Sequence, residues 1–394
     1  MTILNHDAPL QCEVPISYKL RYPLQILPNK DLRSMTLLID PDLVETLNSI
    51  LVPDVEEPLR EVGRILRAEI SDSNVEIELQ LGFPAKGIQA QLEARIREQI
   101  PTDKLTLTFE SSITAHGVQR NLKPLANVKN IIAIASGKGG VGKSTTAVNI
   151  ALALVADGAS TGILDADIYG PSQPLMLGLT DQRPTSTDGK SIQPLLAYGL
   201  QVMSIGFLID PDQPIAWRGP MVTSALNQLL NQTIWDDLDY LIVDMPPGTG
   251  DIQLTLSQQV PVSGAVIVTT PQDIALLDAR KGLQMFRKVS VPILGIVENM
   301  SNHICTKCGY EEAIFGSGGG KKVADDFDVE LIGQLPLDFR IREQVDSGEP
   351  SVVAEPDGPY AQAYRTTARR MAALLAMQGK DYSKSFPKIV VEES

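Results

Sequence analysis

The stretch Gly137-Lys138-Gly139-Gly140-Val141-Gly142-Lys143-Ser144-Thr145 decides the fold of this chain. Its spacing is that of a phosphate-binding loop, in which the backbone N–H groups of a glycine turn surround the phosphates of a nucleotide. The helix that follows directs its positive N-terminus at the same anion. Lys143 is placed to reach the β- and γ-phosphates, and the Ser144 hydroxyl is placed to bind Mg2+. The loop therefore predicts a site for a nucleoside triphosphate and its magnesium ion.

The segments on either side of the loop complete the order strand, loop and helix. Residues 130–135 form a short apolar run typical of a buried parallel strand, and residues 145–156 carry Ala, Val and Leu at helical spacing. Strand and helix candidates alternate from Val128 onward, which predicts an α/β fold of the P-loop NTPase type, with helices flanking a mostly parallel, twisted sheet. Further strands are expected at 161–165, 200–205, 240–244, 264–270, 292–298 and 330–333.

Composition and charge restrict the partners of this protein. The 394 residues include 34 Lys and Arg against 48 Asp and Glu, a net charge of −14, so we expect no nucleic-acid partner. No apolar run approaches the roughly 18 residues of a membrane helix and no secretory signal is visible, so we expect no membrane partner and a cytoplasmic location. Three cysteines, Cys12, Cys305 and Cys308, are too few for a disulfide framework.

The pattern along the chain divides it into five segments. Residues 1–39 contain four prolines among mixed polar and apolar residues and are expected to form a poorly ordered arm. A small α+β domain is expected at 40–115, a polar linker at 116–127, the NTPase domain at 128–380 and a C-terminal tail at 381–394. In the small domain we expect helices at 43–51 and 88–100, a turn at 55–61, and strands at 63–70, 74–81 and 105–109.

Three aspartates follow strands of the predicted sheet. Ligands of such sheets bind beyond the carboxyl ends of the strands, so Asp165, Asp167 and Asp244 are expected near the phosphate loop. We expect Asp167 to orient an attacking water, Asp165 to support Mg2+ or the loop, and Asp244 to hold Mg2+ through water. The glycines after Asp244 allow that segment to move when the γ-phosphate leaves. A solvated acidic turn is the alternative for Asp165 and Asp167.

Lys138 is a second lysine within the loop, directly after its first glycine. We expect a lysine at this point to reach a phosphate across a subunit interface and to add positive charge as the transition state develops, so hydrolysis would depend on dimerisation. An exposed surface lysine is the alternative. Asn299, Pro336 and Asp338 also follow strands, where loops read the base of a nucleotide, and we expect Asn299 to contact the bound nucleotide.

Cys305-Thr306-Lys307-Cys308 lies in the loop after the strand expected at 292–298. Two thiolates at this spacing bind one metal ion or cluster, and thiolates are preferred ligands of zinc and of iron–sulfur clusters. Such a centre needs four ligands, which two chains meeting about a twofold axis would supply together. A thioredoxin-like redox pair and two structural thiols are the alternatives. We expect His303 to be a polar loop residue rather than a ligand.

Five separated motifs, taken together, resemble the Mrp/ApbC-type iron–sulfur cluster carriers, which belong to the deviant Walker A group with MinD and the nitrogenase iron protein. The motifs are KGGVGKST at 138–145, DADIYGPSQP at 165–174, WRGPM at 217–221, DMPPGTGD at 244–251 and the C-x-x-C at 305–308. The resemblance implies that the loop binds ATP and that Lys138 is the signature lysine. It also implies that Asp167 and Asp244 lie on the two switch segments, and that Cys305 and Cys308 are bridging cluster ligands.

The function implied by this resemblance is that of a homodimeric ATPase. It would hold a labile [4Fe–4S] cluster between two subunits and transfer the cluster to apo iron–sulfur client proteins. Two alternatives stay open: a zinc-bridged dimeric ATPase that acts as a metallochaperone, and a MinD-like nucleotide-dependent surface switch. The second predicts a basic amphipathic terminal helix, but the tail ends in Glu392-Glu393 before its last residue, which argues against membrane insertion.

The region 40–114 is similar to the small domain that often precedes such ATPases and also occurs alone in iron–sulfur assembly proteins. That domain commonly carries a cysteine in a T-x-A-C-P-like turn, whereas this chain reads Gly82-Phe83-Pro84-Ala85-Lys86. The departure argues against a ligand role for the small domain. A docking or regulatory role stays open.

Overall fold

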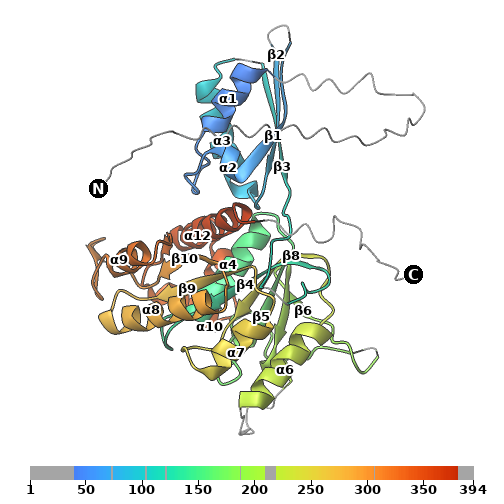
Figure 1. Cartoon of the computed structure of the whole chain (residues 1–394). Helices are drawn as coiled ribbons and strands as arrows, with labels where there is room; N and C mark the ends of the chain where they lie inside the picture. Colours follow the sequence, from blue (N-terminus) through green and yellow to red (C-terminus); the bar gives the residue numbers. More distant parts are fainter. Residues whose placement is uncertain are drawn as a thin grey trace, which may run out of the picture. The chain divides into compact units, whose positions relative to one another are not determined.

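The computed structural model describes residues 40–71, 74–102, 104–119, 122–186, 188–208, 219–305 and 307–379. The arm predicted at 1–39, the tail predicted at 381–394 and the first two residues of the WRGPM motif lie outside these ranges. The described residues build a sheet of three strands, a sheet of eight strands and a two-stranded hairpin (Figure 1).

The three-stranded sheet belongs to the N-terminal part of the described chain and has the order β1-β2-β3. β1 and β2 form an antiparallel hairpin, whereas β3 runs parallel to β2. Side chains along β2 alternate between half-buried and buried, because successive residues of a strand point to opposite faces. The strands and the longer helices lie within two residues of their predicted bounds, and the short α2 begins in the segment 55–61 expected to turn and ends one residue beyond it. The elements are α1 (Pro41–Ser49), α2 (Leu59–Val62), β1 (Gly63–Ser71), β2 (Asn74–Leu81), α3 (Gln89–Gln99) and β3 (Leu105–Ser111).

The turn at residues 82–86 is part of the hydrophobic core of this small α+β unit. Phe83 and Ala85 are fully buried, and Pro84 between them is buried as well. None of the five side chains carries a thiol, an imidazole or a carboxylate. The turn therefore stabilises the fold by apolar packing and offers no side-chain ligand to a metal.

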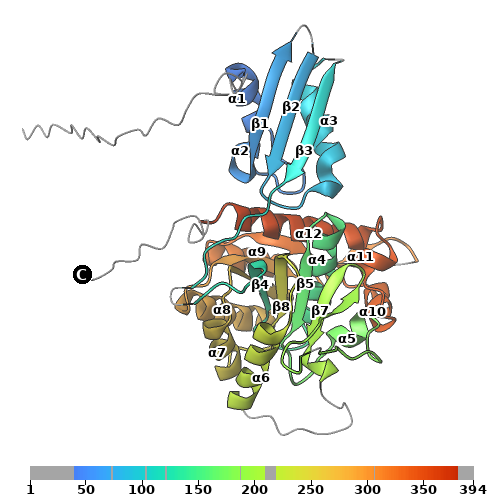
Figure 2. The ribbon, with the colours of Figure 1, turned by 90° about the vertical axis from the view of Figure 1, so that its right-hand side faces the viewer.

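The eight-stranded sheet has the order β13-β10-β9-β4-β8-β5-β7-β6. Every neighbouring pair is parallel except β6 and β7. β5 and β9 are buried along their whole length, as expected of parallel strands that helices cover on both faces (Figure 2). The predicted α/β class is confirmed. The strands are β4 (Val128–Ala135), β5 (Thr161–Asp165), β6 (Leu195–Ala197), β7 (Leu200–Ser204), β8 (Leu238–Asp244), β9 (Gly264–Thr269), β10 (Ile293–Glu298) and β13 (Leu331–Gln334).

The edge strand β6 was not among the predicted strands. It is joined to β7 by Tyr198 and Gly199, whose φ values of 52° and 80° make a tight hairpin turn. Positive φ at both central residues gives the turn a twist that matches that of the two strands. A strand of three residues is too short for hydrophobic periodicity to indicate it.

Helix α12 packs against α4, the helix that follows the phosphate loop. Asp157, directly after α4, accepts hydrogen bonds from Arg365 over 2.8 Å and from Arg369 over 2.6 Å. Asp157 and Arg369 are almost completely buried, and Arg369 also pairs with Asp54. None of the helices in the described ranges has the length and apolar content needed to cross a lipid bilayer. The helices after β4 are α4 (Lys143–Ala156), α5 (Gln173–Met176), α6 (Gly219–Gln232), α7 (Asp251–Gln259), α8 (Asp273–Lys288), α9 (Gly319–Asp326), α10 (Phe339–Asp346), α11 (Ser351–Ala354) and α12 (Pro359–Ala376).

Candidate functional site

Adjacent strands bring the predicted aspartates to the phosphate loop. β4, which leads into the loop, lies beside β8, and β8 lies beside β5. Asp244 at the end of β8 is paired in register with Asp165 at the end of β5 and with Ile134 of β4. The carboxyl ends of three parallel strands therefore place both carboxylates next to the loop, where ligands of such sheets bind.

The phosphate loop is held by hydrogen bonds between side chains and its backbone. The Ser136 hydroxyl donates to the Lys138 carbonyl oxygen, and the Asn299 amide donates to the Val141 carbonyl oxygen, both over 2.9 Å. Gly142 has a φ of 78°, and a Cβ on it would lie 2.1 Å from the Asn299 amide nitrogen, so the position requires glycine. Asn299 thus supports the loop, and its contact with a nucleotide stays a prediction.

Lys143 is the buried cation of this site, with 6% of its side chain exposed. Its ammonium pairs with Asp244, donates to the Ser144 hydroxyl over 3.1 Å and lies 4.0 Å from an Asp167 oxygen. Asp244 is fully buried, so Lys143 neutralises a carboxylate that bulk water does not reach. The lysine predicted to bind phosphate is therefore paired with the carboxylate predicted to bind Mg2+.

Asp165 anchors the segment that carries Asp167. Burial and the neighbouring Asp244 raise the pKa of Asp165 to about 7. Four hydrogen bonds from the protein make Asp165 a support for this segment, and a role in holding Mg2+ stays a prediction. Its carboxylate accepts hydrogen bonds from the backbone N–H groups of Asp167, Ser172 and Gln173 over 3.2, 3.0 and 3.1 Å, and from the Ser204 hydroxyl over 3.0 Å.

Gln173 is a site residue that sequence reasoning missed. Its amide nitrogen donates to Asp244 over 2.9 Å and to the Ser144 carbonyl oxygen over 3.1 Å, and the side chain is fully buried. It thereby ties the carboxylate of β8 to the first turn of α4. One indication of this role is visible in the sequence, because Gln173 is a polar residue in the same DADIYGPSQP motif as Asp165 and Asp167.

The side chains around Lys143 suit a magnesium ion. Mg2+ prefers oxygen ligands, and the Ser144 hydroxyl and the carboxylates of Asp167 and Asp244 supply them. One Asp167 oxygen is buried without a hydrogen-bond partner in the described part of the chain, and burial raises the pKa of Asp167. A buried oxygen of this kind needs a cation or a water molecule to compensate it. A cavity of about 210 Å³ reaches Asp167 and the loop.

Lys138 lines the same cavity and is half-buried. Its carbonyl oxygen is fixed by Ser136, whereas its ammonium forms no ion pair or hydrogen bond with other described residues. The lysine is therefore available to a further anion. Its predicted reach across a subunit interface stays a prediction.

The C-x-x-C lies at the tip of a short hairpin made by β11 (His303–Ile304) and β12 (Glu311–Glu312). The Cys305 N–H donates to the Tyr310 carbonyl oxygen over 2.9 Å, which closes the base of the tip. Cys305 is half-buried and Cys308 is exposed, and both are free thiols. Strands of two residues give no periodic pattern, so the sequence indicated the thiol pair and not its hairpin.

The backbone of the hairpin tip is arranged around the sulfur of Cys305. Backbone N–H groups of Lys307 and Cys308 donate to this sulfur and hold the pKa of the Cys305 thiol below its usual range. Gly309, with a φ of 71°, turns the chain after the second cysteine. A lowered thiol pKa favours the thiolate, which is the form that binds metals. The backbone of the tip therefore favours the form of Cys305 that a metal or cluster would require.

The thiol pair stands apart from other metal-binding side chains. Over the ranges that the structure describes, no group of three or more His, Cys, Asp or Glu side chains could hold a metal ion. The His303 Nδ1 atom contacts the Leu337 carbonyl oxygen at 2.9 Å, so this ring is engaged with the backbone. The structure brings the loop, the aspartates and Asn299 together, and it joins the cysteines to none of them by a hydrogen bond or ion pair among these residues.

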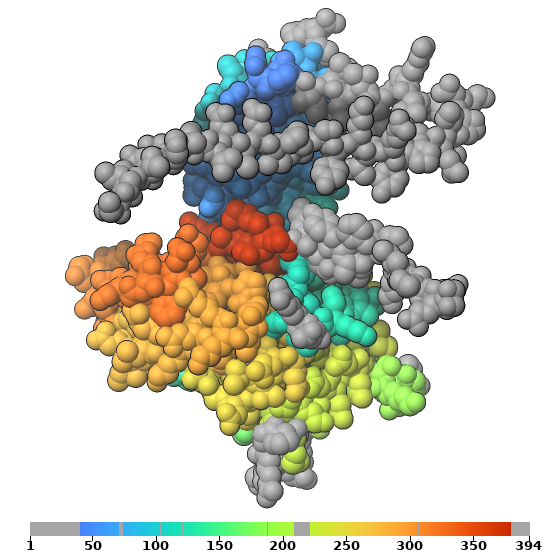
Figure 3. Space-filling model, viewed as in Figure 1, coloured from blue at the N-terminus to red at the C-terminus, as the bar shows by residue number. Residues whose placement is uncertain are grey.

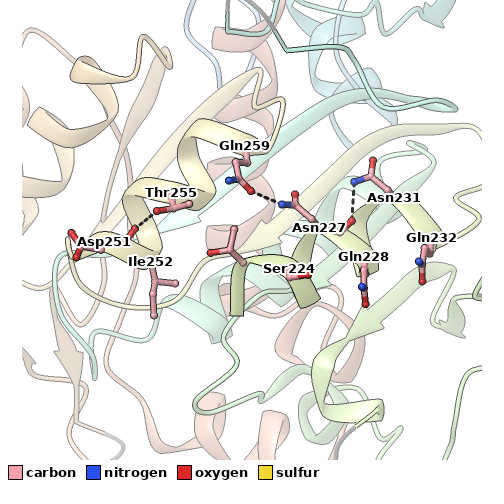
Figure 4. Close-up of a pocket in the computed structure, with 10 residues that line it drawn as sticks. Ser224, Asn227, Gln228, Asn231, Gln232, Asp251, Ile252, Thr255 and Gln259 are labelled. Atoms are coloured by element: carbon pink, nitrogen blue, oxygen red, sulfur yellow. Dashed lines mark hydrogen bonds between the residues drawn. The ribbon is translucent and has the colours of Figure 1, made fainter. Parts of the chain in front are cut away.

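A larger cavity, of about 820 Å³, lies between α6 and α7 and is lined by neither the phosphate loop nor the cysteines. We call it the α6–α7 groove (Figure 4). Size alone does not make it the nucleotide site, because none of the described residues that line it is a lysine or belongs to a glycine turn, both of which phosphates require. Its lining residues are Thr223, Ser224, Asn227, Gln228, Asn231, Gln232, Asp251, Ile252, Thr255 and Gln259.

The sheet order, the glycine loop at the start of α4 and the buried Lys143–Asp244 pair define a P-loop NTPase. Comparison with known proteins narrows this class. The sequence model of the ParA group that is described as the NUBPL iron-transfer P-loop NTPase matches residues 127–372. This chain belongs to that family.

Named relatives agree with this assignment. An iron–sulfur cluster carrier protein of Haemophilus influenzae is 53% identical over 331 residues, which cover 83% of this chain and 90% of the relative. The iron–sulfur cluster transfer protein NUBPL of Mus musculus is 52% identical over 256 residues, or 64% of this chain and 80% of the relative. A solved nucleotide-binding protein of Archaeoglobus fulgidus, in complex with ADP, is 36% identical with a TM-score of 0.53, covering 59% of this chain and 91% of that one.

Proposed function

We propose that this protein is an iron–sulfur cluster carrier, which binds and hydrolyses ATP, holds a labile [4Fe–4S] cluster between two subunits and transfers it to apoproteins. The observation that carries the proposal is the thiol pair of Cys305 and Cys308 on an exposed hairpin whose backbone favours the thiolate. The names of relatives with high identity support the same cargo.

We infer a homodimer from the number of thiol ligands that one chain supplies. A [4Fe–4S] cluster takes four thiolates, and one chain supplies Cys305 and Cys308. Two hairpin tips facing each other across a twofold axis complete the set without a further ligand from either chain. Because the ligands come from an exposed tip rather than a buried core, a client protein reaches the cluster directly, which suits transfer.

We assign ATP hydrolysis to residues in and around the cavity of about 210 Å³ that reaches Asp167 and the phosphate loop. Lys143 leaves Asp244 for the β- and γ-phosphates of ATP, and Asp167 orients the water that attacks the γ-phosphorus. The bond from phosphorus to the bridging oxygen breaks, and ADP and phosphate leave. Lys138 of the partner subunit adds charge at the phosphates, so hydrolysis requires the dimer.

Mg2+ would be held by the Ser144 hydroxyl and, through water, by Asp244, and it would neutralise charge on the phosphates. Gln173 keeps Asp244 in place once Lys143 has moved, because its hydrogen bond to that carboxylate does not involve the lysine. The free thiols of Cys305 and Cys308 suit a reducing compartment, and we propose a cytoplasmic location on that ground.

Metal analysis of the full-length protein tests the cargo. The protein is reconstituted anaerobically with iron and sulfide, and iron, sulfide and zinc are counted per dimer beside Cys305→Ser and Cys308→Ser variants. We expect close to four irons and four sulfides per dimer, lost in either variant, with nucleotide binding retained in both. Zinc bound by the same cysteines in place of iron, or iron retained in the Cys305→Ser variant, contradicts the proposal.

A further inference from the structure

A second glycine-rich segment, at residues 316–320, links the hairpin of β11 and β12, which we call the cysteine hairpin, to α9. It is glycine at four of its five positions. Gly316 and Gly318 have φ values of 94° and 75°, a backbone conformation that residues with a Cβ rarely adopt. Gly320 is buried, and a Cβ on it would lie 2.7 Å from a carboxylate oxygen of Glu298. The glycines therefore allow the chain to turn back from the hairpin and to begin α9 directly against Glu298.

Glu298, the last residue of β10, holds the exit of the cysteine hairpin. Its side chain is fully buried, and its two carboxylate oxygens accept hydrogen bonds from the Gly320 N–H and, over 3.0 Å, from the Gln334 amide. The N-terminus of α9 thus supplies the positive end that stabilises a carboxylate. Because this carboxylate already occupies the N-terminus of α9, we interpret the glycine segment as a structural link rather than as a second phosphate site.

The two residues after Glu298 contact the phosphate loop. The Asn299 amide donates to the Val141 carbonyl oxygen over 2.9 Å, and Asn299 is almost completely buried. Met300 has a φ of 57°, a left-handed conformation that is uncommon for a residue with a Cβ, and its Cε atom lies 3.9 Å from where a Cβ on Gly142 would lie. Residues held in such a conformation need support from surrounding contacts and are concentrated at functional sites and switch regions. The chain therefore enters the cysteine hairpin through a strained residue beside the phosphate loop.

The root of the cysteine hairpin is held to the segment that follows β13. Both the N–H and the hydroxyl of Ser301 donate to the Leu335 carbonyl oxygen, over 2.9 and 3.1 Å, and the Leu337 N–H donates to the Asn302 carbonyl oxygen over 2.7 Å. The Leu335 N–H in turn donates to the Glu298 carbonyl oxygen over 2.9 Å. Figure 3 shows the orange part of the chain, around α9, at the surface of the molecule. Entry and exit of the hairpin therefore both return to the end of β10, and movement of that strand end carries the exposed tip with it.

We propose that residues 298–300 couple the phosphate loop to the cysteine hairpin, so that a nucleotide bound in the loop changes the position of the two thiols. This inference rests on the proposed carrier function and names the element that regulates the cluster site. The loop backbone surrounds the phosphates, so binding acts on the carbonyl group that Asn299 holds. Because the three residues are consecutive, a shift of Asn299 also moves Glu298 and Met300, which fix the two ends of the hairpin. Coupling between two sites is reciprocal, so a cluster at the tip changes the affinity for nucleotide by the same factor.

The rate at which iodoacetamide alkylates Cys305 and Cys308 in the cluster-free, full-length protein, followed by mass spectrometry, tests this coupling. We expect Mg2+ with saturating adenylyl imidodiphosphate to change the rate constant of at least one thiol by about fivefold or more, the lower end of coupling between sites. Gly320→Ala, whose Cβ displaces α9 from Glu298, should reduce this change to less than about twofold. Lys321→Ala is the matched control in the same turn of α9, because that side chain is 62% exposed, and it should respond like the unsubstituted protein.

A second variant keeps the test valid if Gly320→Ala does not fold. Gln334→Ala removes a hydrogen bond to Glu298 from an exposed residue and should also reduce the response of the thiols to nucleotide. Circular dichroism confirms the fold of each variant, and a fluorescent ATP analogue confirms that its loop is saturated. Alkylation rates that nucleotide leaves unchanged in the unsubstituted protein would overturn the coupling. A response that persists in full in both variants would assign it to covering of the tip by a partner subunit and would also overturn the proposal.

Iron content separates this inference from the proposed function. After anaerobic reconstitution, the dissociation constant of the fluorescent ATP analogue should differ by about fivefold or more between the loaded and the cluster-free protein, and by less than about twofold in Gly320→Ala. If nucleotide changes the alkylation rates but no iron is loaded, the carrier function fails and the coupling stands. If iron is loaded but nucleotide leaves the alkylation rates unchanged, the coupling fails and the carrier function stands.

Discussion

Substitution of Lys143 by methionine is expected to destabilise the protein in the absence of nucleotide. Lys143 is the cation that neutralises Asp244, and that carboxylate is fully buried. Removing one partner of a buried ion pair leaves an uncompensated charge and costs about 3–5 kcal/mol. For a domain of this size each kcal/mol corresponds to about 2–4 °C, so the midpoint of thermal unfolding should fall by roughly 6–20 °C.

The rescue variant makes this expectation specific to charge. Lys143→Met/Asp244→Asn removes both charges and keeps an oxygen that accepts from Gln173, so its midpoint should return to within a few degrees of the original. Lys281→Met is the matched control, because that lysine is 64% exposed and its ion pair contributes less than about 1 kcal/mol. The assay is circular dichroism at one scan rate without nucleotide. If the unfolding midpoint of Lys143→Met equals that of the unsubstituted protein, the reasoning is wrong. It is also wrong if the midpoint of the double variant is no higher than that of Lys143→Met.

Three other substitutions follow from contacts of the site and of α12. Asp167→Asn should lower the ATPase rate at least about 100-fold while a fluorescent ATP analogue still binds, and a rate within tenfold of the original would exclude its role in orienting water. Gly142→Ala should abolish binding of that analogue, because a Cβ meets the Asn299 amide; unaltered affinity would contradict the loop geometry. Arg369→Leu should cost roughly 3 kcal/mol in chemical denaturation, since Asp157 stays buried with one arginine fewer, whereas a loss below about 1 kcal/mol would count against this ion pair.

The large sheet could be predicted from the sequence because its strands are continuous apolar runs that end in polar residues. The strand expected at 161–165 and β5 coincide, and those expected at 264–270 and 292–298 differ from β9 and β10 by one residue at one end. A strand that is buried on both faces needs apolar residues at nearly every position, so it is visible in the sequence as a continuous apolar run. β6, β11 and β12 have two or three residues each, which is too short for a hydrophobic pattern. Their pairing depends on the turns and strands next to them in the same chain.

The nucleotide site could be predicted as far as its motifs reach. Parallel strands deliver their last residues to one edge, so Asp244 was expected near the loop before any contact was known. Gln173 was not, because its importance lies in two hydrogen bonds to residues distant in sequence. The sequence did not indicate the hydrogen bond from Asn299 to the Val141 carbonyl oxygen, and contact of Asn299 with the nucleotide stays a prediction. Motifs identify the chemistry of a side chain, and only packing fixes what the side chain touches.

Lys143 has one anionic partner in the structure and a second in the proposed nucleotide complex, and exchange between the two would connect the nucleotide to α7. Its ammonium pairs with Asp244 in the structure, and the phosphates of ATP attract the same group. Asp244 is buried, so loss of the Lys143 charge to a bound nucleotide would require a compensating positive charge and would change the forces on the chain directly after it. That chain is the glycine-containing segment from Met245 to Gly250, and α7 begins at the next residue. A ligand shifts a conformational equilibrium only as far as its affinity differs between the two conformations. Here the two conformations would be those in which Lys143 pairs with Asp244 or with the nucleotide, and they would differ close to the start of α7.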